Sequence, residues 1–441
     1  MKPRIDSKKF YFSILFFAFL ISFTPTKAQY LLNSDSAFKA GAPNSGRLWG
    51  YVFGDYYYKG HADSLNRGGN NQYTGIPTGR NAFQFRRIYL GYDYNISQKF
   101  STELLLAAED NFPAFNPPSS AAASGDEALN NKEAFFIKLA NIRWKNVWKG
   151  TDLVVGEQAT PAFPLLSEKI WSYRSIERTI ADIRRTPSYD LGVGLQGVLD
   201  PSTKNFGYDL LVANGSSAKP ASTSFKWFYG DIYYWFLDKK LVVDLYADYQ
   251  RLNWSSSWHH DRQMVKGYVA YTTPALTIGA EGFINTIRND TRAYLGGGNG
   301  SDTINTAANG LSFYVHGNIV PNKLRFFARV DLYNPNKNIG SDSAYAGISS
   351  PNGYNSGSYK ATYNNTGAVA SVTSLGDISS KETFFTIGLD FTPYKNVHFM
   401  PNIWYTHYKS QLATVPGVAA GTSDANFDIV YRMTFYFVFG K

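Results

Sequence analysis

The stretch that decides the fold is FDIVYRMTFYFVF, residues 427–439. Its odd-numbered positions are all apolar or aromatic, from Phe427 to Phe439, whereas Asp428, Arg432 and Thr434 lie on the opposite face. A period of two is that of a β-strand. In a transmembrane barrel the apolar set faces lipid and the polar set faces the lumen. The stretch therefore predicts a strand that spans a membrane and closes a barrel.

The same alternation occurs further upstream, in residues 323–334. Leu324, Phe326 and Leu332 belong to one face, and the other face carries Arg325 and Arg329. A soluble β-sandwich also alternates, but its buried face is normally aliphatic and its strands are shorter. We therefore expect these two arginines to point into a barrel lumen.

Sixteen segments of the chain read as strands, and most have the 9–11 residues, roughly, that a tilted transmembrane strand needs. Short turns such as 96–98, 237–240 and 393–396 alternate with long polar stretches such as 111–131, 287–309 and 335–381. This alternation predicts one all-β domain, a transmembrane antiparallel β-barrel. The expected strands are 47–59, 83–95, 99–110, 132–145, 152–160, 188–199, 205–214, 225–236, 241–252, 263–273, 275–286, 310–320, 323–334, 382–392, 397–409 and 427–440.

The composition agrees with a membrane barrel. The chain has 32 Tyr, 32 Phe and 9 Trp, and amphipathic rings are favoured at a membrane–water interface. Cysteine is absent, so a disulfide-stapled module is excluded. After Phe23 no apolar run approaches the ~18 residues of a spanning helix, which leaves a closed barrel as the way to cross lipid.

The first 28 residues are expected to be a signal peptide that is removed. Basic residues precede an apolar run at 10–23, and Ala28 ends the segment. A retained anchor is the alternative. Without the leader the chain keeps 38 of its 43 basic residues and 33 of its 34 acidic ones, an excess too diffuse for nucleic-acid binding. A short segment, 29–46, then precedes the barrel, 47–441. It is too short for the plug domain of an active transporter.

Several motifs resemble those of the phosphate-selective porin O/P family. They are FRRIYLG at 85–91, FSTEL at 100–104, VGEQ at 155–158, SIERT at 175–179 and DLGVGL at 190–195. The resemblance implies a homotrimeric, sixteen-stranded porin in the outer membrane of a Gram-negative bacterium. Small hydrophilic solutes would diffuse through it passively, with a preference for anions such as phosphate. Its partners would be outer-membrane lipid and these solutes.

The resemblance also implies that the third external loop, 161–187, folds into the barrel and narrows it. This segment is unusually apolar for a loop, so it must pack against something. By resemblance Arg86, Arg87 and Arg178 line an anion path, since guanidinium groups bind phosphate and carboxylate. The period of two places Arg86 and Arg87 on opposite faces, and Arg87 is the better candidate for the lumen. The other candidate pore-lining residues are Arg174, Arg184, Arg185, Arg325 and Arg329.

Two alternatives remain open at this stage. The loop arginines could brace the fold through ion pairs, for example with Glu177, instead of serving anions. The barrel could also be a surface structural or adhesive protein with no open channel. A measurement of conductance distinguishes such a barrel from a porin.

Other chemistry has little support in the sequence. GGNGSDTIN at 297–305 matches one copy of a calcium-binding repeat, which binds only in tandem. His259 and His260 beside Asp261 lack the spacing of further metal ligands. No catalytic motif, cofactor motif or metal motif is predicted, so an enzyme is not expected.

Overall fold

Antiparallel strands make up almost all of the regular structure in the computed structural model. The model describes residues 43–63, 73, 76–109, 134–183, 187–221, 223–254, 259–294, 301–338, 359–363, 369–374, 380–411 and 426–440. The signal peptide expected at 1–28 lies outside these residues. Among them, no helix has the length and apolar character required to cross a membrane.

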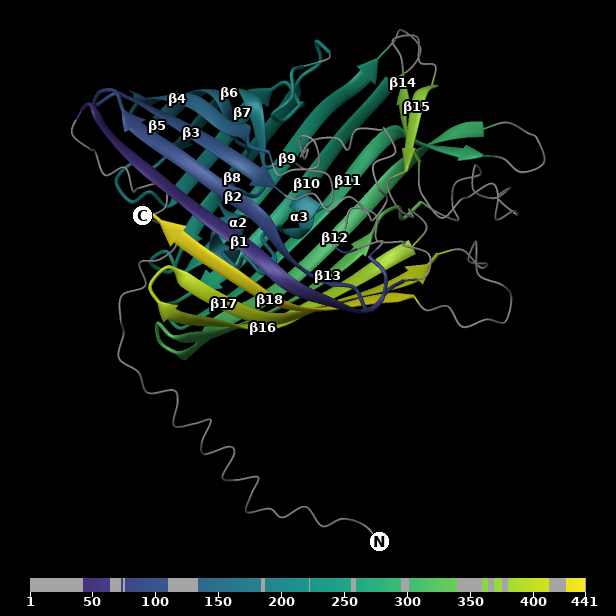
Figure 1. The fold of residues 1–441 in the computed structure, drawn as a ribbon. Helices are drawn as coiled ribbons and strands as arrows, with labels where there is room; N and C mark the ends of the chain where they lie inside the picture. Colours follow the sequence, from purple (N-terminus) through teal and green to yellow (C-terminus); the bar gives the residue numbers. More distant parts are fainter. Residues whose placement is uncertain are drawn as a thin grey trace, which may run out of the picture.

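The described residues form eighteen strands and two short helices, which Figure 1 labels. The strands of the first half are β1 (Ser45–His61), β2 (Asn81–Asn95), β3 (Phe100–Glu109), β4 (Phe136–Trp148), β5 (Thr151–Ala159), β6 (Tyr189–Val198), β7 (Phe206–Ala213), β8 (Trp227–Phe236) and β9 (Leu241–Trp254). Those of the second half are β10 (His259–Thr272), β11 (Leu276–Tyr294), β12 (Ser301–Val320), β13 (Leu324–Asn334), β14 (Tyr359–Tyr363), β15 (Val369–Ser374), β16 (Ser380–Tyr394), β17 (Val397–Ser410) and β18 (Phe427–Phe439). The helices are α2 (Ser167–Trp171) and α3 (Ile180–Ile183).

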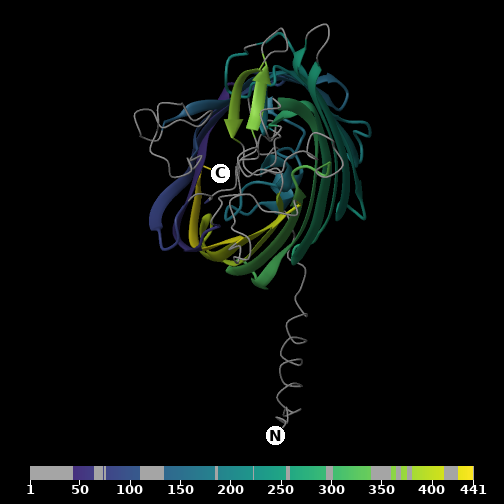
Figure 2. The ribbon, with the colours of Figure 1, turned by 90° about the vertical axis from the view of Figure 1, so that its right-hand side faces the viewer.

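Sixteen of these strands form a closed wall, as predicted. Each strand pairs antiparallel with the next, and β18 pairs with β1 from Gly50↔Phe439 to His61↔Ile429. The hairpin β14–β15 stands apart, since β13 pairs directly with β16. Figure 2, turned by 90° from Figure 1, shows the wall closing into a ring. Closure leaves no free strand edge in lipid.

The two faces of the wall differ as the alternation predicted. On β18, Tyr431, Met433 and Phe437 are exposed on the outer face, whereas Arg432 and Thr434 are buried on the inner face. Exposed apolar side chains of this kind recur around the whole wall, which gives the barrel a lipid-compatible outer surface.

Two expectations about loops were wrong. The stretch 287–309 is not one long loop, because β11 and β12 continue through most of it and pair as far as Tyr294↔Ser301. The stretch 335–381 contains the hairpin β14–β15, which also touches β11 through the pair Thr291↔Lys360. Both stretches are polar and rich in Gly and Asn, and their backbones can still pair outside the membrane, where no apolar face is needed.

Candidate functional site

The segment between β5 and β6, described at residues 160–183 and 187–188, enters the interior of the barrel. We call it the crossing loop. Its two ends are tied together where they leave the wall, since the Thr160 amide donates to the Ser188 carbonyl and the Thr160 hydroxyl to the Pro187 carbonyl. Figure 1 shows α2 and α3, which belong to this loop, within the outline of the barrel.

The crossing loop reaches the opposite wall, where an apolar cluster receives it. The Trp171 ring packs edge-on against Tyr314 of β12 and Phe327 of β13, with centroids 5.0 and 6.2 Å apart. The cluster also includes side chains of β1, β8, β9, β10, β16, β17 and β18. Burial of so many rings holds the loop in one place. It also fills part of the lumen.

Hydrogen bonds from the wall to the loop backbone add to this packing. Arg432 donates to the Ser175 carbonyl at 2.6 Å, and Arg329 donates to the Arg178 carbonyl at 2.7 Å. The Glu281 carboxylate accepts from the Ala181 amide at 3.1 Å. Backbone groups that are buried without a partner are costly, so these side chains make the interior position of the loop tolerable.

Ion pairs join the loop to β2. Glu177 lies 2.6 Å from Arg86 and 3.6 Å from Arg87, and the Arg86 side chain is fully buried. Both arginines therefore face the lumen, and the expectation that they lie on opposite faces was wrong. The reason is a β-bulge: Phe53 pairs with Arg87 and Gly54 with Phe85, so Arg86 is the extra residue.

The fully buried Asp55 of β1 is a second node of this network. Arg432 lies 2.7 Å from both Asp55 oxygens, Arg86 lies 3.4 Å away, and the Tyr73 and Thr434 hydroxyls donate to the same carboxylate. Beside it, Glu109 pairs with Arg87 at 3.4 Å and with Lys138. The four cations Arg86, Arg87, Lys138 and Arg432 thus face the three carboxylates Asp55, Glu109 and Glu177, so little net charge remains.

The arginines of the crossing loop, Arg174 and Arg178, are more exposed to solvent than the buried Arg86. Arg174 lies 3.1 Å from Glu168 and its side chain is 19% exposed; Arg178 lies 3.2 Å from Asp182 and is 23% exposed. Desolvation raises the pKa of the Glu168 carboxyl above its ordinary value, although Arg174 beside it acts in the opposite direction. The carboxyl of Glu168 therefore takes up a proton at a higher pH than an exposed glutamate.

The remaining predicted arginines have different positions. Arg325 lies 3.1 Å from the Nδ1 atom of His316, on the inner face. Arg329 is buried and pairs with Asp331 at 2.5 Å. Arg184 and Arg185 lie outside the described residues. Within the described part of the chain, no group of three metal-ligating side chains occurs, and His259 and His260 belong to β10.

Sequence reasoning named Glu177 as a possible ion-pair partner of the loop arginines but missed two other carboxylates of this site. Asp55 and Glu109 contact the predicted arginines, and Arg432 was noted only as a residue of the polar face. An Asp or Glu on the inner face of β1 or β3 could have been predicted as a partner of Arg86 or Arg87 only if the register between neighbouring strands were known.

No protein-family model and no curated protein matches the chain. Solved structures of outer-membrane proteins do. The outer membrane channel DcaP of Acinetobacter baumannii aligns with a TM-score of 0.56 at 12% identity, covering 91% of this chain and 99% of that one. OmpF of Salmonella typhi aligns at 0.49, with 11% identity and coverages of 89% and 98%. OmpT of Vibrio cholerae, in a trimer form, aligns at 0.49, with 9% identity and coverages of 90% and 100%.

The likeness to DcaP concerns the fold alone. The described strands form a closed sixteen-stranded antiparallel β-barrel with an apolar outer face, and DcaP has a similar fold. Closed barrels of this kind belong to the outer membrane of Gram-negative bacteria, so the predicted localisation is confirmed at the level of the fold.

Proposed function

We propose that the protein is a porin through which small hydrophilic solutes diffuse passively, with a preference for anions. The observation that carries the proposal is a sixteen-stranded closed barrel with charged side chains on its inner face. Barrels of this size leave an aqueous channel. Arg174 and Arg178 of the crossing loop are the partly exposed cations beside this path.

The anion preference is proposed to be general, and not specific for phosphate. Arg174 and Arg178 each have a carboxylate partner, and the arginines of β2 share Glu177. A group already held by a carboxylate can attract a passing anion but does not bind it strongly. We also propose that the protein belongs to the phosphate-selective porin O/P family, whose motifs it resembles. The same proposal includes assembly as a homotrimer.

A second candidate is a structural or adhesive barrel without an open channel. The apolar cluster around Trp171, which fills part of the lumen, favours it. The two functions differ in a swelling assay with liposomes that contain the purified protein. A porin admits small sugars and amino acids at rates that fall with solute size, and potassium salts of small anions faster than chloride salts of large cations. A closed barrel gives no swelling above protein-free liposomes.

A further inference from the structure

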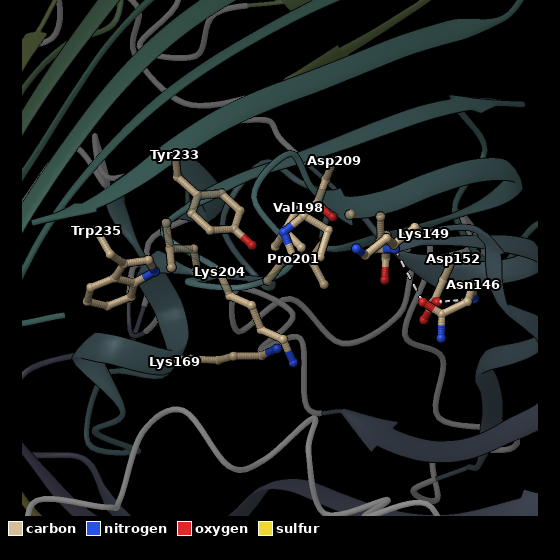
Figure 3. A pocket seen from close by; sticks show the side chains of 15 residues that line it. Asn146, Lys149, Asp152, Lys169, Val198, Pro201, Lys204, Asp209, Tyr233 and Trp235 are labelled. Carbon is tan, nitrogen blue, oxygen red and sulfur yellow. Dashed lines mark hydrogen bonds between the residues drawn. The ribbon is translucent and has the colours of Figure 1, made fainter. Parts of the chain in front are cut away.

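A pocket of about 560 Å³ lies below the crossing loop, toward the short turns of the barrel. Its lining comes from α2 and the residues before it, from the strands β4 to β8, and from the turns that follow β4 and β6. Short turns face the periplasm in barrels of this type, so the pocket opens at the periplasmic end. Figure 3 shows the side chains that line it.

Three lysines from three separate segments line this pocket. Lys149 belongs to the β4–β5 turn, Lys204 to the β6–β7 turn, and Lys169 to α2. In Figure 3 the side chains of Lys169 and Lys204 project toward the same part of the pocket. Like charges that converge repel one another, and an anion between them relieves that repulsion.

Of the two acidic residues that line the pocket, Asp152 is engaged by groups beside it. Asp152 lies 3.1 Å from Arg143, and its other oxygen accepts from the Asn146 amide at 2.8 Å. Asp209 is buried, and its carboxylate attracts Lys169, which leaves Lys149 and Lys204 as the lysines available to a ligand. The lysines Lys149 and Lys204, in contrast, are exposed and can reach a ligand.

The pocket also offers an aromatic wall. Tyr233 and the buried Trp235 project from β8 on the inner face, beside Leu166 of the crossing loop. Gly207, opposite Tyr233 on β7, makes room for that ring, since a Cβ at Gly207 would lie 2.1 Å from the Tyr233 ring. Binding pockets of 300–1,000 Å³, roughly, combine apolar walls with a few polar groups in this way.

We propose that this pocket is a binding site for small organic anions that carry a carboxylate or phosphate on a ring or another apolar body. The lysines bind the charged group, and Tyr233, Trp235 and Leu166 contact the body. The inference rests on the proposed porin function, in which such a site retains the solute at the periplasmic mouth of the barrel.

The test uses benzoate, which has both a ring and a charge, with acetate and neutral benzamide as probes that lack one of the two. Each probe is added to one side of a planar bilayer that holds the full-length mature barrel, and the single-channel current is recorded. Benzoate added on the periplasmic side should reduce the current in a saturable manner, at lower concentration than on the outer side. Acetate and benzamide should have much weaker effects.

The Lys149→Gln/Lys204→Gln double variant should weaken benzoate block by about tenfold or more, because hydrogen bonds to charged groups are among the strong ones. The matched control is Lys239→Gln/Lys240→Gln, in the β8–β9 turn at the same end of the barrel, which should block as the wild type does. Tyr233→Leu should weaken block by benzoate and leave the small effect of acetate unchanged. Equal block by all three probes, or equal loss in both lysine variants, would overturn the proposal.

Calorimetric titration of benzoate into the detergent-solubilised protein separates the two proposals. Saturable binding that the Lys149→Gln/Lys204→Gln change removes, in a protein without conductance, would support the pocket and refute the porin. Conductance without saturable benzoate binding or block would refute the pocket and leave the porin standing.

Discussion

The guanidinium of Arg86 in β2 lies 2.6 Å from the carboxylate of Glu177 in the crossing loop, and both side chains are buried. A loop that crosses a lumen needs such contacts to stay in place, because water competes with the protein for its polar groups. The same arginine also reaches Asp55, which holds Arg432, which in turn donates to the loop at Ser175. The wall and the loop therefore form one network of ion pairs and hydrogen bonds, and this network holds the loop inside the barrel.

We predict that Glu177→Gln loosens the loop. Removing one partner of a buried ion pair costs about 3–5 kcal/mol, because it leaves uncompensated charge. The temperature at which the barrel loses its compact electrophoretic mobility should fall, and the open-channel current should become noisier.

The matched control for that change is Asp93→Asn, which breaks the pair between Asp93 and the 28% exposed Arg47. A partly exposed pair contributes about 1 kcal/mol or less, so stability and current noise should stay near wild type. If both variants behave alike, the Arg86–Glu177 pair does not hold the loop.

Charge selectivity should depend on Arg174 and Arg178, the partly exposed arginines of the crossing loop. Replacing Arg174 and Arg178 by Gln leaves Glu168 and Asp182 without partners and makes the lumen more negative. An interaction of about 1 kcal/mol lost per passing anion lowers the anion-to-cation permeability ratio by a factor of roughly five. The reversal potential in a potassium chloride gradient measures this ratio.

Arg288→Gln is the control for selectivity. Its side chain is 55% exposed near the outer end of β11, so salt screens its charge, and the reversal potential should change little. If the loop double variant lowers heat stability and leaves the reversal potential unchanged, the loop arginines only brace the fold.

Acidification should raise the anion preference through Glu168. Its pKa is raised by desolvation, so it becomes neutral as the pH falls, sooner than an exposed glutamate does. Neutralisation removes a negative charge beside Arg174 and leaves the lumen more positive; Asp182 and Arg87 also act on Glu168 and do not reverse this direction. In Glu168→Gln the permeability ratio should already be high at neutral pH and change less between pH 7 and pH 5. An equal pH response in both proteins would exclude Glu168 as its source.

Closure of the barrel should depend on β18. Deletion of residues 427–441 removes the pairing of β18 with both β1 and β17, and the exposed edges cannot be accommodated in lipid. We expect no stable protein in the outer membrane by fractionation and immunoblotting. Deletion of 359–374, which carries the hairpin outside the wall, should leave normal amounts. Loss of the protein in both variants would show that the hairpin is needed for assembly.

The wall was predictable from the sequence because strand alternation is local. Each of the sixteen expected strands overlaps a strand of the wall, since period two and tight turns are visible in the chain itself. The extended hairpin β11–β12 was missed because the sequence of its outer part is polar and rich in Gly and Asn, which is typical of a loop. Periodicity alone cannot distinguish a polar hairpin in water from an irregular segment.

The site was predictable only in part, for a similar reason. FRR and the loop arginines could be named, but the bulge that turns both Arg86 and Arg87 inward depends on the register between β1 and β2. The pairing of Asp55 with Arg432 joins residues at opposite ends of the chain. Such contacts arise from closure of the barrel, and no local sequence pattern indicates them.

The proposed porin function depends most directly on whether an open path remains beside the crossing loop. Single-channel recording of the purified protein in a planar bilayer, with a potassium chloride gradient, tests this in one experiment. We predict discrete conductance steps and a reversal potential with the sign of anion preference. A reversal potential at zero or of the opposite sign would contradict the anion preference and leave a general porin, whereas a bilayer that stays silent with folded protein inserted would contradict the channel itself.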